Sequence, residues 1–281
     1  MNNMIQLKFF ILVACAVLPL CFGSAHAQQN SIAVTPVSID AKVKRGASYT
    51  QTFNLTNNTG TRLRFQCSVQ DIWYDEHNNR ITGNPGTLPR SASLWVQFLP
   101  REVFVEPGSS TAVKAIITVP QTAAGGYYSM PVFEATPADH SVQVSTAPQG
   151  STATASIAVR FRGLMMVTTL DASEYNVEIL GGRISPPSTS AELIVELELY
   201  NRSTAHVRVR GAFAILNSSG GLAGRGTIRE KRYLPGQQNT LRTDWAGALP
   251  PGKYTSVITL SYDRVGTEPA TLVYELPLVV P

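Results

Sequence analysis

The sequence predicts an all-β protein made of two antiparallel β-sandwiches in tandem. The first observation is the run 93–133, in which β-branched and aromatic segments are separated by turn residues. Residues 94–105, 111–119 and 127–133 are the expected strands. Pro107 and Gly108 form the first turn, because proline presets φ and glycine tolerates a positive φ.

The second observation is that this pattern of strands and turns occurs twice along the chain. Pro107 to Tyr127 spans twenty positions in the first copy, and Pro235 to Tyr254 spans nineteen in the second. The predicted strand upstream of each copy is also similar: it reads F-N-L-T-N, ending at Asn57, in the first copy and L-E-L-Y-N, ending at Asn201, in the second. A repeat of this size indicates two copies of one domain, because solenoid repeats have periods of about 20–50 residues.

The first 27 residues have the pattern of a secretory signal peptide. The apolar run 9–20 follows Lys8, and Ala25-His26-Ala27 is a small-x-small cleavage site. The run is shorter than the ~20 residues that a transmembrane helix needs. We expect the mature chain to begin at Gln28; the alternative is a lipoprotein-type cleavage before Cys15. No membrane insertion is expected after cleavage.

The mature chain that remains after cleavage is predicted to contain two domains, residues 28–170 and residues 171–281. Each is long enough to bury its own core. Cys15 and Cys21 would leave with the signal peptide, so Cys67 remains without a disulfide partner. Cys67 shares the apolar face of a period-two strand with Leu63 and Phe65, which predicts a small buried hydrophobe and not a nucleophile.

Composition and motifs argue against several function classes. The formal charge is +4, and the charged residues, 15% of the chain, are scattered without a basic stripe, so no nucleic-acid partner is expected. No nucleophile, metal or phosphate motif occurs, so we expect no enzyme, cofactor or metal. The polar run 75–79 is interpreted as a solvated hairpin tip and not a metal loop. His140 and His206 are interpreted as isolated.

The segment after Phe133 is unusual. Residues 135–156 carry hardly any bulky side chain and predict a long loop. This loop leads into a predicted long strand, 157–170, with Ile157, Val159 and Phe161 on one face and Arg160 and Arg162 on the other. A loop of this kind on a rigid scaffold indicates a partner site. The alternative is a hairpin tip without a function.

In the second domain we expect a crossover over residues 171–190, with Gly181-Gly182 and Pro186-Pro187 as breakers. Alternation of Leu193, Val195, Leu197 and Leu199 favours a strand over a helix in the next segment. The remaining expected strands are 206–216, 241–245, 254–262 and 270–280.

Two such domains behind a signal peptide resemble the PapD-like periplasmic chaperones of usher-assembled pili, whose domains are immunoglobulin-like. The best local matches are W-V-Q-F-L-P-R-E-V-F-V-E-P-G-S-S, which resembles the family's strand-turn-strand, and I-A-V-R-F-R-G-L-M-M, which is similar to its first-domain closing strand. The segment beginning at Asn201 resembles the turn that opens the family's second domain. The resemblance covers nearly all of the mature chain.

The resemblance implies a periplasmic chaperone that completes pilin-like subunits by β-strand donation, with an outer-membrane usher as a further partner. It implies that Arg162, with Arg160 beside it, binds the subunit's C-terminal carboxylate. Ala153, Ala155, Ile157 and Val159 would enter the subunit groove. The family's second cleft arginine has no counterpart in residues 31–40. The alternative function is an exported structural or adhesive protein without chaperone activity.

Overall fold

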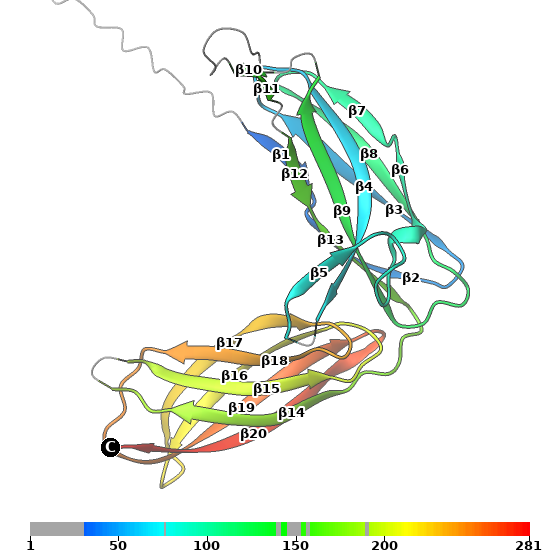
Figure 1. Cartoon of the computed structure of the whole chain (residues 1–281). Helices are drawn as coiled ribbons and strands as arrows, with labels where there is room; N and C mark the ends of the chain where they lie inside the picture. Colours follow the sequence, from blue (N-terminus) through cyan, green and yellow to red (C-terminus); the bar gives the residue numbers. More distant parts are fainter. Residues whose placement is uncertain (1–30, 76, 139–141, 145–152, 156–157, 189–190) are drawn as a thin grey trace, which may run out of the picture.

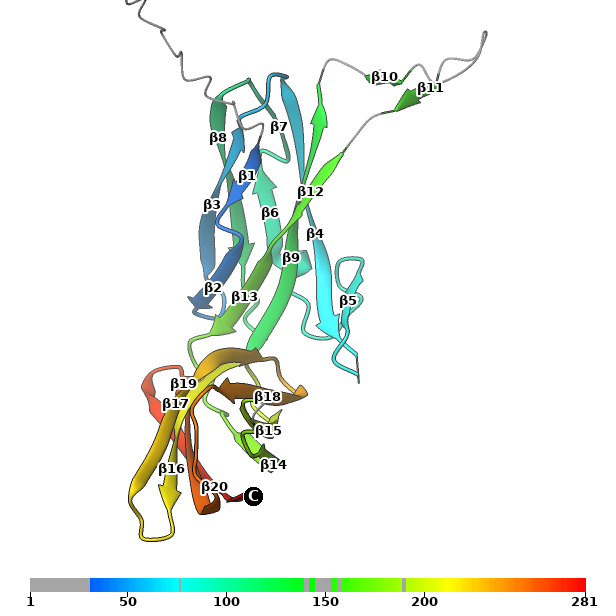
Figure 2. The same ribbon diagram turned by 90° about the vertical axis from the view of Figure 1, so that its left-hand side faces the viewer.

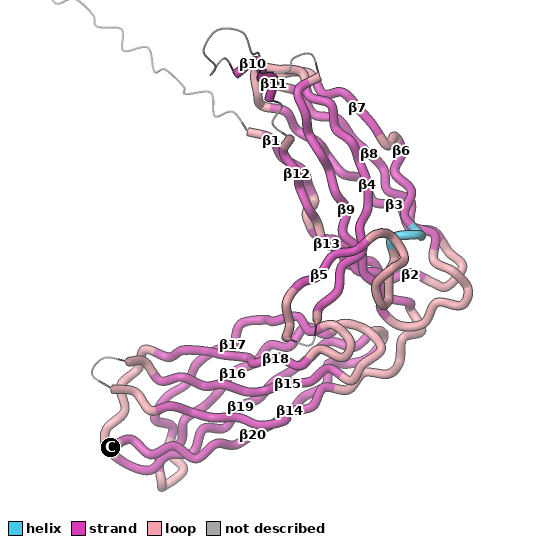
Figure 3. The backbone as a smooth tube through the Cα atoms, in the orientation of Figure 1, coloured by secondary structure: helices cyan, strands magenta, loops and turns pink. Residues whose placement is uncertain are grey.

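The computed structural model describes residues 31–75, 77–138, 142–144, 153–155, 158–188 and 191–281, and it shows two β-sandwich domains that meet at an elbow (Figure 1). Figure 3 shows that strands make up most of the described chain. In these ranges the only helix is the short 3₁₀ turn η1 (Ser93–Trp95). No helix in them is long and apolar enough to cross a membrane. The prediction of two all-β, immunoglobulin-like sandwiches is confirmed.

The first domain contains two facing sheets. One sheet has the order β1 (Ile32–Thr35), β3 (Ser48–Asn57), β8 (Ser109–Thr118), β6 (Val96–Leu99). The other has the order β2 (Ser38–Val43), β13 (Leu164–Thr169), β9 (Gly126–Pro137), β4 (Leu63–Tyr74), β5 (Arg80–Gly83). Two further strands join this second sheet: β12 (Val159–Arg162) pairs with β9, and β7 (Glu102–Val105) pairs with β4. A separate hairpin, β10 (Val142–Val144) with β11 (Ala153–Ala155), projects from the end of the sandwich (Figure 2).

Two prolines mark places where the chain of the first domain changes sheet. The predicted strand 94–105 is instead η1, β6 and β7, and β6 and β7 belong to different sheets. Pro100 lies between them and has no N–H for a ladder, so the chain changes sheet there. Pro36 does the same between β1, which pairs with β3, and β2, which pairs in parallel with β13.

The second domain has the same two-layer plan. Its smaller sheet has the order β14 (Val177–Ser185), β15 (Leu193–Asn201), β18 (Gln238–Trp245). Its larger sheet has the order β17 (Leu222–Tyr233), β16 (Val207–Asn217), β19 (Gly252–Arg264), β20 (Thr267–Val280). The prediction of a crossover over 171–190 was wrong for residues 177–185, which form β14. Gly181 and Gly182 directly follow a bulge at Leu180 within that strand and do not end it.

Each domain has its own hydrophobic core. Phe53, Phe98 and Phe133 meet in the first core, with ring centroids 4.8–6.1 Å apart. Leu197, Ile215 and Ile258 are fully buried in the second. A third cluster lies between the domains, where Leu234 of the second domain packs with side chains on the outer face of the first domain's larger sheet: Ile72, Tyr128, Met130, Val132 and Met166.

Candidate partner-binding edge

The strand pairs leave β12 as an edge strand of the first domain's larger sheet. β13 is flanked by β9 on one side and by β2 on the other. β12 continues the same path, as Figure 2 shows, but among the described residues it pairs with β9 alone. The edge is open because the chain before Ser38 has turned away to pair with β3. Gly163, between β12 and β13, allows β2 to begin here, since a Cβ at this position would lie 2.8 Å from the carbonyl oxygen of Val37.

The backbone hydrogen bonds around Gly163 fix which groups face that edge. The N–H of Gly163 donates to Pro131 of β9 at 2.9 Å, and the N–H of Leu164 donates to Val37 on the opposite side at 2.9 Å. Backbone groups alternate along a strand. The N–H and C=O groups of Arg160 and Arg162 therefore point away from β9, toward the open edge. They are the groups that an added strand would bind.

The side chains of β12 alternate as the sequence predicted. Phe161 pairs with the buried Phe133 and packs partly against the first core, and Val159, on the same face, is 38% exposed. Arg160 and Arg162 lie on the other face and are exposed. The core-facing side of this strand is thus an apolar surface that its own domain covers only in part.

The two arginines differ in their partners. Arg160 forms an ion pair with Glu134, the residue opposite it on β9. Arg162 lies opposite the apolar Val132 and has no ion pair with any described residue. Arg162 is therefore free to bind an external anion, while Arg160 is already neutralised.

The other residues proposed for the donated surface lie further along the chain. Ala153 and Ala155 belong to β11, where Ala155 pairs with Val142 of β10. Ile157 lies outside the described residues. The role of these residues stays a prediction, and so does that of Val159. Phe161 was not proposed as a donated residue, although its alternation with Val159 could have identified it.

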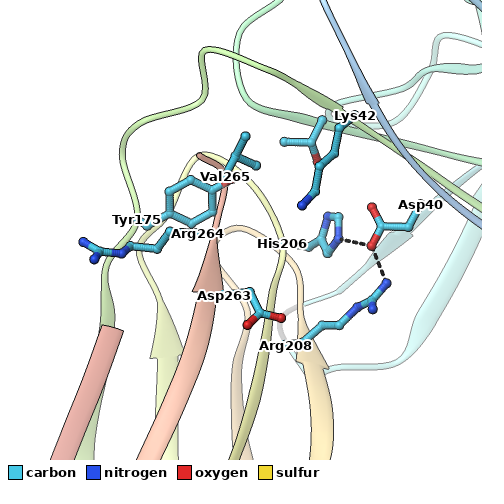
Figure 4. Close-up of a pocket in the computed structure, with 9 residues that line it drawn as sticks. Asp40, Lys42, Tyr175, His206, Arg208, Asp263, Arg264 and Val265 are labelled. Carbon is cyan, nitrogen blue, oxygen red and sulfur yellow. Dashed lines mark hydrogen bonds and ion pairs between the residues drawn. The ribbon is translucent and has the colours of Figure 1, made fainter. Parts of the chain in front are cut away.

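The junction between the domains contains a polar cluster that the sequence did not predict. His206 was interpreted as isolated, and that interpretation was wrong: its Nε2 lies 3.3 Å from Asp40 Oδ2, and its Nδ1 lies 3.5 Å from the hydroxyl of Tyr128. Arg208 also pairs with Asp40 (Figure 4). The contacts join β2 and β9 of the first domain to the second, over 166 positions in sequence for Asp40 and His206. His140, the other histidine interpreted as isolated, lies outside the described residues.

The charges in this cluster act on Asp40. Burial alone would raise the pKa of its carboxyl, but the hydrogen bond and charge of His206 and the charges of Arg208 and Arg232 outweigh burial and hold the pKa below the ordinary value. The ionised carboxylate is therefore the favoured form. The cluster lines a small polar cavity of about 80 Å³, which Lys42, Thr168, Tyr175 and Asp263 also line.

The other residues that might carry chemistry have structural positions. Cys67 is buried as predicted, and burial raises the pKa of its thiol to about 12. Asp75 lies in the β4–β5 hairpin turn and accepts backbone N–H bonds from His77 and Asn79. Within the described ranges no three His, Cys, Asp or Glu side chains form a group that could hold a metal.

Comparisons with known proteins return structures and no sequences. No protein-family model matches the chain, and no curated protein matches it. Solved structures similar to it include the class 5 fimbriae chaperone CfaA, with 15% identity, a TM-score of 0.45 and coverage of 89% of this chain and 100% of that one. A chaperone–tip adhesin complex of CFA/I fimbriae gives 14% identity, a TM-score of 0.46 and coverage of 87% and 98%.

The Pseudomonas aeruginosa CupB2 chaperone is similar at the same level, with 11% identity, a TM-score of 0.40 and coverage of 84% of this chain and 97% of that one. Sequence identities this low indicate a similar fold and do not show a shared function. What this chain binds must therefore be argued from its own geometry.

Proposed function

We propose that this protein is a periplasmic chaperone that binds an incomplete β-sandwich subunit by adding β12 to it. The open edge of β12 is the observation that supports this proposal. An exposed row of backbone donors and acceptors is a template for another strand. The partly covered Val159 and Phe161 would supply apolar side chains to the subunit's groove.

The position of β2 limits how far an added strand can run along this edge. β2 runs parallel to β13 and begins at Ser38, directly beyond the open edge. A partner strand that also ran parallel to β12 would have to end before Val37, and its C-terminus would lie beside Arg162 and Gly163. A free guanidinium at that point suits a terminal carboxylate, which arginine can bind through two hydrogen bonds. We therefore assign the carboxylate to Arg162, with Arg160 as its neighbour.

Another open edge of the molecule is less suited to pairing. β20 is the outermost strand of its sheet, and Val273 on it is 61% exposed. This strand contains Pro269 and Pro277, which have no N–H to donate. Prolines of this kind protect edge strands from pairing. The contrast favours β12 as the recognition strand.

The remaining parts of the proposal concern location and partners. Residues 1–27, which lie outside the described ranges, would direct export. The mature protein would act in the periplasm on pilin-like subunits, with an outer-membrane usher as the next partner in assembly. The proposed role is binding and needs no catalysis. The competing function is an exported structural or adhesive protein whose two sandwiches act as spacers.

A photo-crosslinking side chain at position 159 tests the proposal in the cell that makes the protein. We expect one exported polypeptide to be crosslinked at 159, and its sequence to contain one strand fewer than a complete sandwich. The same crosslinker at position 273 of β20 is the matched control and should capture nothing. Equal crosslinking from both positions, or a crosslinked protein with a complete fold, would favour the competing function.

A further inference from the structure

Two arginines of the second domain face each other at the domain junction. Arg208 of β16 and Arg232 of β17 are directly opposed partners in the antiparallel ladder. The neighbouring pair, Val207 and Tyr233, is buried in the second core. Because side chains alternate, Arg208 and Arg232 both leave the outer face of this sheet, the face on which Arg208 meets Asp40 of the first domain (Figure 4).

The carboxylates nearest this pair are shared with other side chains. Asp40 pairs with Arg208 and His206. Asp263 is held by Arg210, with two hydrogen bonds of 2.9 and 3.1 Å. The oxygens of Glu230 lie 3.9 Å from Arg208 Nε and from Arg210 Nη1, which is beyond hydrogen-bond distance.

Arg232 forms no ion pair with any described residue, although it lies near enough to Asp40 to lower the pKa of that carboxyl. Directly opposed like charges on a sheet are destabilising. Arg232 is therefore the member of the pair that has no carboxylate within ion-pair distance among the described residues.

The hydrogen bonding is also incomplete. The Nε atoms of both Arg208 and Arg232 are buried and have no hydrogen-bond acceptor. Buried donors are almost always paired, so two unpaired donors on directly opposed arginines need an explanation. A guanidinium Nε–H matches the oxygens of carboxylate, phosphate and sulfate groups. Two such donors on directly opposed arginines offer the charge and the hydrogen bonds that an oxyanion accepts.

We propose that Arg208 and Arg232 form an oxyanion-binding site at the junction of the two domains. The ligand is a free tetrahedral anion or a carboxylate carried by a bound polypeptide; both offer the same acceptor oxygens. The site is distinct from the β12 edge and does not depend on strand donation.

The test follows the arginine Nε–H signals of the full-length mature protein by NMR during titration with sodium sulfate, sodium acetate and sodium chloride at matched ionic strength. The signals of Arg208 and Arg232 should shift together and saturate with sulfate or acetate but not with chloride. Saturation with sulfate alone would assign a free tetrahedral anion, and saturation with acetate would assign a carboxylate. Shifts that stay linear, or that are equal for all three salts, would overturn the proposal.

Variants separate the site from general charge effects. Arg232→Gln should abolish the saturable shift at Arg208, and Arg232→Lys, which keeps the charge but has no Nε–H, should weaken it. Arg229→Gln removes an exposed charge from the same strand and should leave the titration unchanged. The dispersion of the backbone amide signals reports whether each variant is folded. A folded Arg232→Gln protein that responds as the original does would also overturn the proposal.

Discussion

Asn201 makes in the second domain the same buried hydrogen bonds that Asn57 makes in the first. Each side-chain amide donates to the carbonyl of the residue four positions ahead and to the carbonyl two positions before the turn proline. The distances are 2.8 Å to Thr61 and 2.9 Å to Val105 for Asn57, and 3.0 Å to both Ala205 and Tyr233 for Asn201. The duplication seen in sequence is thus repeated in the contacts of individual atoms.

The first prediction concerns these two amides. Asn57→Ala or Asn201→Ala should lower the free energy of unfolding of its domain by about 2–3 kcal/mol, because the carbonyl of Val105, or the carbonyls of Ala205 and Tyr233, lose a buried donor. Chemical denaturation measures the loss. Asn217→Ala is the control: Asn217 accepts bonds from Ser219 and Gly221 in an exposed turn, where water can replace it. Equal losses for all three variants would contradict this explanation.

The second prediction concerns Asp71, a fully buried carboxylate. It accepts the backbone N–H groups of Thr87 and Leu88 at 2.7 and 2.8 Å and the hydroxyl of Ser91. Burial would raise its pKa, but the hydrogen bonds outweigh this and hold the pKa below the ordinary 3.8. The loop after β5 therefore depends on the ionised form of this side chain.

Asp71→Asn should lower the free energy of unfolding by about 1.5–3 kcal/mol, because one carboxylate oxygen is replaced by a donor. Amide hydrogen exchange should show faster opening at Thr87 and Leu88 than elsewhere in the domain. Asp244→Asn, at an exposed site, should change little. Unchanged exchange at Thr87 and Leu88 in the Asp71→Asn variant would show that the loop does not need the charge.

The third prediction is a pH dependence of the domain junction. The folded-state pKa of Asp40 is below its ordinary 3.8, so its stabilising contribution is fully present above pH ~4 and is lost as the pH falls through the lower folded value. Spin labels on the two domains would measure this. The distance distribution should broaden below pH ~4, and Asp40→Asn should broaden it already at neutral pH. A distribution that stays narrow in both cases would contradict it.

The fourth prediction separates the two arginines of β12. Arg162→Ala should weaken capture of the partner subunit roughly tenfold or more, because the terminal carboxylate loses a charged hydrogen bond. Arg160→Ala is the matched control and should change capture little, because Arg160 is already paired with Glu134. Binding of the purified subunit by each variant gives the comparison. Equal weakening by both variants would remove the assignment to Arg162.

The sequence predicted the fold well because period two and turn chemistry are local signals. Leu63, Phe65 and Cys67 lie on one buried face as their spacing indicated. The role of Pro100 was misinterpreted because, in the sequence alone, two short strands in different sheets have the same pattern as one strand interrupted by a proline. β14 was missed because Gly181 and Gly182 mark a bulge as readily as a loop.

The site was only partly predictable for a different reason. Arg160 and Arg162 could be assigned to one face from alternation alone. That β12 has an open edge depends on which sheet the residues before Ser38 join, and this is a long-range pairing. The contact of His206 with Asp40 and the opposition of Arg208 and Arg232 likewise arise only from the folded arrangement.

The most direct test of the central claim compares Arg160→Pro with Arg160→Ala. Both changes remove the side chain and its pair with Glu134. Proline also removes the N–H that faces the open edge, while the bonds to β9 made by Val159 and Phe161 remain. We predict that the proline variant folds but no longer captures the partner subunit, whereas the alanine variant captures it normally. Capture by a folded proline variant as strong as that by the alanine variant would contradict strand addition at β12.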